Sequence, residues 1–149
     1  IQGGKGYSIT FKQPEKSPPL PIVCGEAKIG VTPMIDALRF AGTLELAGLD
    51  LSISRQRVAA VLRGVPEYLP DLRPDQMELE EIWRGLRPCT PDGLPYLGRA
   101  PHIENLTVAA GHAMIGVSLG PITGKLVSEV VGGEKPSIDL NLLKVDRYG

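Results

Sequence analysis

The segment LTVAAGHAMIGVSLGPITGKLVSEVVGG, residues 106–133, decides one half of the fold. Leu106 to Ala110 is a continuous apolar run, which is typical of a strand buried on both faces. A glycine-containing loop from Gly111 to Gly116 follows, and Val117 to Val131 then carries apolar residues at helical spacing. Gly132-Gly133 predicts the end of that helix. The segment therefore predicts a strand, a tight loop and a helix in direct succession.

The first 87 residues have a different pattern, in which short apolar stretches are separated by turn residues. Alternation of apolar and polar residues predicts a strand from Tyr7 to Phe11. Further strands are predicted at residues 20–23, 27–34, 37–40, 43–46 and 79–86, with a break at Ala41-Gly42. Ser52-Ile53-Ser54 offers cap residues for a helix from about Arg55 to Arg63, which Gly64 and Pro66 are expected to end.

Connections as short as these cannot form parallel crossovers, so the strands should pair in antiparallel fashion. The expected fold class is therefore α+β. It combines a largely antiparallel sheet and one helix with the strand–loop–helix unit of residues 106–133.

Composition narrows the class of protein. The chain has 149 residues and a formal net charge of −1, so it can bury a real core and has no basic face for nucleic acid. Two histidines and two cysteines without zinc-site spacing predict no metal centre. The chain begins at Ile1 rather than Met, and we interpret this start as a cut boundary.

The loop from Gly111 to Gly116 is the first candidate site. A glycine-rich turn lets the backbone approach a ligand, and a helix N-terminus presents N–H groups with partial positive charge. This arrangement suits an anion or an electron-rich carbonyl, such as the edge of a flavin ring. The alternative is a plain turn whose glycines only allow tight packing. Neither a G-x-G-x-x-G fingerprint nor a P-loop occurs in the sequence.

Single side chains add further candidates. Arg87 follows an apolar strand and precedes Pro88, so it could clamp a carboxylate by two hydrogen bonds; the alternative is a surface pair with Asp92. Tyr7 could line a pocket, although a strand aromatic usually belongs to the core. His112 is expected to pack and donate one hydrogen bond rather than to act as a base.

The stretch WRGLRPCTPDGLPYLG, residues 83–98, resembles the C-terminal signature of D-amino-acid dehydrogenases. Glycine oxidases, sarcosine oxidases and other D-amino-acid-oxidase-like flavoenzymes are similar. Asn105-Leu106 leading to Gly111-His112 resembles a second flavin-contacting segment of that family. Lys5 to Ser8 and Arg39 to Glu45 resemble strands of its substrate domain, so the likeness runs from Lys5 to the Asp146-Arg147-Tyr148 end.

The resemblance implies a two-domain FAD enzyme that oxidises an amino acid at Cα–N by passing a hydride to flavin, after which the imine hydrolyses. Such chemistry needs orientation more than a side-chain base. It implies that Arg87 binds the substrate carboxylate, with Tyr7 as a second substrate-binding candidate. The residues implied to contact the flavin are Gly111, His112, Ala113, Met114, Ile115 and Gly116. Met114 and Ile115 stand where some relatives have a charged residue, which leaves the substrate side chain open.

The same resemblance implies a division into a substrate-domain portion, residues 1–88, and a C-terminal flavin-contacting segment, residues 89–149. The family's N-terminal dinucleotide-binding domain has no counterpart in the sequence. We therefore expect the chain alone neither to bind FAD tightly nor to catalyse.

The expected partners are a small amino acid and the missing FAD domain. Exposed apolar surface predicts self-association. The expected location is cytoplasmic, with peripheral attachment of the intact enzyme to the inner membrane as an alternative. Two other functions stay open: amine oxidation like that of glycine or sarcosine oxidase, and a non-catalytic small-molecule or protein-binding module of the same ancestry.

Overall fold

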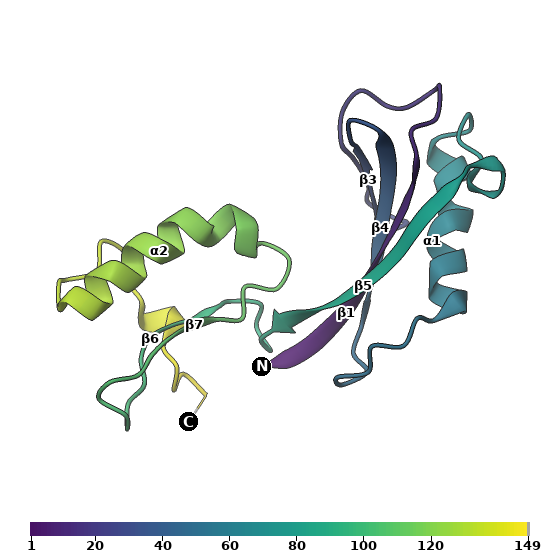
Figure 1. The fold of residues 1–149 in the computed structure, drawn as a ribbon. Coiled ribbons are helices and arrows are strands. Elements are labelled where there is room, and N and C mark those ends of the chain that lie inside the picture. Colours follow the sequence, from purple (N-terminus) through teal and green to yellow (C-terminus); the bar gives the residue numbers. More distant parts are fainter. Residues whose placement is uncertain (149) are drawn as a thin grey trace. The chain divides into compact units, whose positions relative to one another are not determined.

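The computed structural model describes residues 1–148 and divides into two compact units (Figure 1). One unit comprises residues 4–86, and the other comprises Ile1–Gly3 and the chain from Arg87 onward. The α+β class with a largely antiparallel sheet is confirmed. Within residues 1–148, every helix is too short or too polar to cross a lipid bilayer.

Five strands form the larger sheet: β1 (Gln2–Lys12), β2 (Ile22–Cys24), β3 (Ile29–Pro33), β4 (Ala37–Glu45) and β5 (Leu79–Cys89). Their order in the sheet is β2-β3-β4-β1-β5. The β1–β4, β2–β3 and β3–β4 pairs are antiparallel. The alternation that predicted β1 places Tyr7, Ile9 and Phe11 in the core, and this prediction is confirmed.

The predicted break at Ala41-Gly42 is wrong, because β4 continues through both residues. Gly42 is in register with Ile29 on one side and Tyr7 on the other. A Cβ atom at Gly42 would lie 2.9 Å from Val61 Cγ2, so the glycine allows close packing of a helix on the sheet. The register shift comes later, where Thr43 adopts a φ of +72° opposite the Lys5–Tyr7 stretch.

The helix α1 (Arg55–Tyr68) packs against β3 and β4. It begins where the sequence predicts, and the Ser54 hydroxyl accepts a hydrogen bond from the Arg57 N–H at 3.4 Å. The predicted end at Gly64 is wrong, because the helix runs through Gly64 and Pro66 to Tyr68. Val58, Val61 and Val65 are buried along its length, and this packing outweighs the poor helix propensity of its last turns. A 3₁₀ turn, Pro74–Gln76, leads into β5.

The second unit contains β6 (Tyr96–Arg99), β7 (Thr107–Ala110), α2 (Gly116–Gly132) and a 3₁₀ turn, Asn141–Leu143. β6 and β7 pair in antiparallel fashion, and α2 packs on both. The predicted helix is confirmed. Burial of the preceding strand on both faces is wrong for the described chain, because β7 has β6 as its strand partner and Ala109 is exposed. Val117, which is 95% exposed, and Val131 leave apolar surface on α2.

Candidate flavin and substrate site

Arg87 lies near the end of β5 and is partly buried. Its Nη1 atom is enclosed and has no hydrogen-bond partner among residues 1–148. The alternative interpretation, a pair with Asp92, is wrong because both oxygens of that carboxylate bind Arg147 instead. A buried donor without a partner costs about 1–3 kcal/mol, and an acceptor bound at Nη1 would recover that cost.

The loop from Gly111 to Gly116 connects β7 to α2, as the sequence predicts. Gly111 is buried with a φ of +88°, and a Cβ atom there would lie 2.5 Å from Thr90 Cγ2. The chain's own packing therefore requires glycine at this position. Tight packing, the alternative that the sequence left open, accounts for Gly111 without any ligand.

The rest of the loop is held by its backbone. Ala113 has a φ of +46°, and its N–H donates to the Pro88 carbonyl at 3.0 Å. This bond ties the loop to the residue that follows Arg87. Ile115 is the N-cap of α2 without a side-chain cap, so the first helical N–H groups lack a partner within the helix. These donors and their partial positive charge fit the electron-rich edge of a flavin ring, which makes the loop compatible with FAD.

The side chains of the loop have unequal roles. Met114 is 73% exposed and Ile115 is 50% exposed, so neither side chain belongs to the core of this unit. His112 Nε2 lies 3.0 Å from Thr123 Oγ1 on α2. The histidine thus bonds within its own unit, in agreement with the packing role favoured for it.

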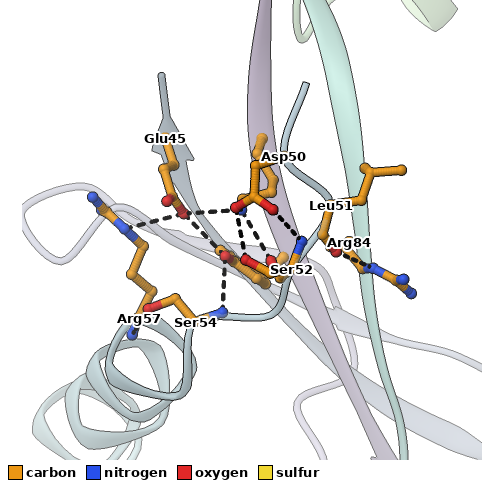
Figure 2. Close-up of polar contacts among 9 residues, drawn as sticks. Glu45, Asp50, Leu51, Ser52, Ser54, Arg57 and Arg84 are labelled. Atoms are coloured by element: carbon orange, nitrogen blue, oxygen red, sulfur yellow. Dashed lines mark hydrogen bonds and ion pairs between the residues drawn. The ribbon is translucent and has the colours of Figure 1, made fainter. Parts of the chain in front are cut away.

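Tyr7 is 1% exposed and belongs to the core of the larger unit. Its hydroxyl donates to Glu45 Oε2 at 2.9 Å and accepts from the Ser54 N–H at 3.2 Å. Figure 2 labels Glu45 and Ser54, the partners of these two hydrogen bonds. With both hydrogen-bonding directions used, this geometry favours the core interpretation of Tyr7 over contact with a substrate.

A buried lysine next to Tyr7 escaped the sequence reasoning. Lys5 is 1% exposed, and its Nζ donates to Asp50 Oδ2 at 3.0 Å and to the Ser52 carbonyl at 2.9 Å. Figure 2 shows Asp50 and Ser52 in this network, which also includes the Arg57–Glu45 ion pair. Lys5 lies in phase with Tyr7 and Ile9 on β1, and that spacing is the signal that could have revealed its burial.

The face of the larger sheet carries a second candidate cation, Arg39. Arg39 lines a hollow of about 490 Å³ together with Ser8, Ala41, Glu81 and Trp83. Its Nε donates to Thr10 Oγ1 at 3.1 Å. Arg39 is thus a competing candidate for a carboxylate anchor, and the sequence reasoning did not single it out.

A final residue that sequence reasoning missed is Arg147, near the C-terminal end. Its Nε and Nη2 contact the two Asp92 oxygens at 3.0 and 2.9 Å. Hydrogen bonding to Arg147 holds the pKa of Asp92 well below its usual range. The two residues are 55 positions apart, so no local pattern reveals the pair.

Comparisons with known proteins identify the family of this chain. A family model described as "DAO: FAD dependent oxidoreductase" matches residues 1–130. The chain is 36% identical over 146 residues to a D-amino acid dehydrogenase of Vibrio atlanticus (strain LGP32), covering 97% of this chain and 34% of the relative. A D-amino acid dehydrogenase of Xanthobacter autotrophicus (strain ATCC BAA-1158 / Py2) is 34% identical with the same coverage.

Among solved structures, glycine oxidase from Geobacillus kaustophilus superposes with a TM-score of 0.89 at 30% identity, covering 99% of this chain and 39% of that one. The chain thus spans about a third of the length of the curated relatives it matches, 34% in each case. The family model covers well over half of the chain. The chain therefore belongs to the DAO family of FAD-dependent oxidoreductases.

Proposed function

We propose that this chain supplies the substrate-carboxylate anchor and part of the flavin-binding surface of an enzyme that oxidises the Cα–N bond of a D-amino acid. The observation that carries the proposal is the enclosed Arg87 Nη1 without a hydrogen-bond partner in residues 1–148. A guanidinium stays charged at all relevant pH values and binds a carboxylate through two parallel hydrogen bonds. The D-amino acid dehydrogenases that match over 97% of this chain support the substrate class.

Within that enzyme, Arg87 would fix the substrate carboxylate and thereby orient the Cα–N bond. The N–H groups at the start of α2 would face the pyrimidine edge of the ring and favour negative charge there. FAD, when bound, would be the oxidant: it would take a hydride (one proton and two electrons) from Cα, while the amino nitrogen loses a proton. The imino acid then takes up water and releases ammonia, and no residue of this chain needs to act as a base for that step.

The decisive experiment uses the full-length product of the gene that encodes this chain. Anaerobic bleaching of its flavin is measured with D- and L-amino acids, glycine and sarcosine. We expect bleaching by a D-amino acid, and Arg87→Met should weaken substrate binding at least about tenfold, or about 1.4 kcal/mol. A product that binds no flavin would contradict the enzyme class and favour a non-catalytic binding module.

Two matched variants locate the anchor. Arg84, three residues before Arg87, is exposed and donates from Nε to the Leu51 carbonyl at 2.8 Å, so Arg84→Met should leave substrate binding within about twofold. Arg39→Met tests the competing cation on the sheet. If Arg39→Met weakens binding and Arg87→Met does not, the anchor is Arg39 and the assignment of Arg87 is wrong.

Glycine-oxidase-like chemistry is the second candidate, because the Geobacillus kaustophilus glycine oxidase matches 99% of this chain at a TM-score of 0.89. The same assay separates the two. Preferential reduction by glycine or sarcosine, with reoxidation by oxygen, would favour the oxidase. Preferential reduction by larger D-amino acids, with slow reoxidation in air, would favour a dehydrogenase.

A further inference from the structure

The guanidinium of Arg147 makes several polar contacts within its unit. Besides the two contacts to Asp92, its Nη2 donates to the Leu94 carbonyl at 2.7 Å and its Nη1 to the Pro95 carbonyl at 3.3 Å. The guanidinium carbon lies 3.9 Å from the ring centre of Tyr96, and only 9% of the side chain is exposed. All three guanidinium nitrogens are therefore used. Apart from the Lys144 carbonyl at 3.3 Å and the Tyr148 ring, the contacts fall on residues 92–96.

The segment that Arg147 holds is a tight turn of residues 90–95. The Thr90 hydroxyl donates to the Leu94 carbonyl at 2.8 Å, and the Leu94 N–H donates to Asp92 Oδ1 at 3.1 Å. The Gly93 N–H reaches the Thr90 carbonyl at 3.4 Å. Asp92 thus serves both the turn and Arg147, so loss of Arg147 should loosen the turn as well as the ion pair.

The turn of residues 90–95 contacts both parts of the candidate site, the Gly111–Gly116 loop and the chain next to Arg87. Thr90 packs directly on Gly111 at the start of the loop, as the 2.5 Å approach of a Cβ built there shows. Thr90 also lies two residues after Pro88, whose carbonyl accepts a hydrogen bond from the Ala113 N–H. A displacement of this turn would therefore move the loop and the chain next to Arg87 together.

We propose that Arg147 is a positioning residue, which sets the geometry of Arg87 and of the Gly111–Gly116 loop through the turn of residues 90–95. This role rests on the function proposed for Arg87 and the loop. Arg147 touches neither substrate nor cofactor in this scheme. Its guanidinium binds two carboxylate oxygens and three carbonyls at once, which a lysine cannot reproduce.

The test compares Arg147→Met and Arg147→Lys with Arg99→Met in the full-length gene product. Arg99 is the matched control, because it also joins segments of this unit through carbonyls, those of Glu104, Val130 and Val131. None of these contacts reaches residues 90–95. Both arginines can affect stability, but only Arg147 should affect the site.

Hydrogen exchange of the ligand-free proteins is the first measurement. Exchange should accelerate in peptides covering residues 88–95 and 111–116 for Arg147→Met, and stay unchanged there for Arg99→Met. Unchanged exchange at residues 111–116 in Arg147→Met overturns the proposal. If Arg147→Met does not fold, Asp92→Asn removes the ion pair with less disruption and should accelerate exchange in the same two peptides; no acceleration overturns the proposal equally.

Steady-state kinetics give the second measurement. Arg147→Met should raise KM for the amino acid at least about tenfold while kcat changes less than about threefold, with Arg147→Lys in between. A KM no different from that of Arg99→Met overturns the positioning role. If the wild-type product is reduced by no amino acid, the proposed function fails, whereas the exchange data still decide whether Arg147 controls the loop.

Discussion

The two units of this chain differ in what holds them together. Residues 4–86 contain one continuous apolar core, whose members are Tyr7, Ile9, Phe11, Cys24, Ile29, Val31, Leu38, Phe40, Val58, Val61, Val65 and Leu72. In the part from Arg87 to residue 148, the buried hydrophobic side chains are Leu97 and Leu126. In this part, the guanidinium groups of Arg99 and Arg147 form hydrogen bonds between segments that share little buried apolar surface. The unit that carries the candidate site thus depends more on polar contacts, which are directional and sensitive to pH.

The largest effect is expected from a cavity in the apolar core. Phe40 is fully buried and meets Phe11 edge to face, with ring centres 5.8 Å apart. Phe40→Ala should lower the free energy of unfolding by about 3–5 kcal/mol. Fluorescence of Trp83, the only tryptophan, reports this unit during urea unfolding. Val117→Ala, at a fully exposed site of the other unit, should change stability by less than about 0.5 kcal/mol. Similar losses for both variants would contradict the large contribution expected from the buried Phe40 ring.

A pair of glycines sharpens the comparison inside the second unit. Gly111 and Gly93 both have positive φ, +88° and +79°, but only Gly111 has a neighbour within 4 Å of a built Cβ. Gly93→Ala should cost about 1 kcal/mol through backbone strain alone. Gly111→Ala should cost about 2–4 kcal/mol, because the clash with Thr90 adds to that strain. Thermal unfolding of the two variants measures the difference, and equal losses would show that Thr90 yields without penalty.

The smallest expected effect is a loss of folding stability at low pH. Hydrogen bonds from Arg147 lower the pKa of Asp92, and hydrogen bonds from Ser52 and Lys5 lower the pKa of Asp50 in the other unit. A carboxyl whose pKa is lowered by folding stabilises the fold above its ordinary pKa of about 4. That contribution is lost as pH falls through the lower, folded-state pKa.

Amide NMR spectra recorded as pH is lowered from about 7 to about 2 should therefore show both units weakening below about pH 4. Asp92→Asn should flatten this dependence for residues 87–148 only, and Asp50→Asn for residues 4–86 only. If either variant flattens the dependence in both units, they do not respond to acid separately.

Local patterns predicted the elements whose causes are local. The alternation around Ile9 predicted β1, and Ser54 predicted the start of α1. The errors arose where distant contacts override local preference. Gly42 predicts a strand break, but close packing of Val61 on it favours a continuous strand. Pro66 predicts a helix end, but burial of three valines along α1 stabilises the helix through it.

The candidate site divides in the same way. Arg87 and the loop of residues 111–116 follow from a strand end and a strand-to-helix turn, which are local signals, together with the family resemblance. Arg147 could not be predicted, because its role exists only once Asp92, 55 residues away, has folded beside it. Nor could the sequence show that Asp92 is engaged and Arg87 therefore lacks that partner.

The burial of Lys5 also has a consequence for its chemical reactivity. Burial opposes the ammonium charge, but the hydrogen bond to Asp50 and the charges of Asp50 and Glu45 outweigh it, so the pKa of Lys5 is raised. A protonated amine has no lone pair with which to attack an acylating reagent, and this one is also enclosed. We expect Lys5 to react as a nucleophile when the segment carrying Asp50 and Ser52 moves away from it. The rate at which Lys5 is acylated would therefore report how often that segment opens.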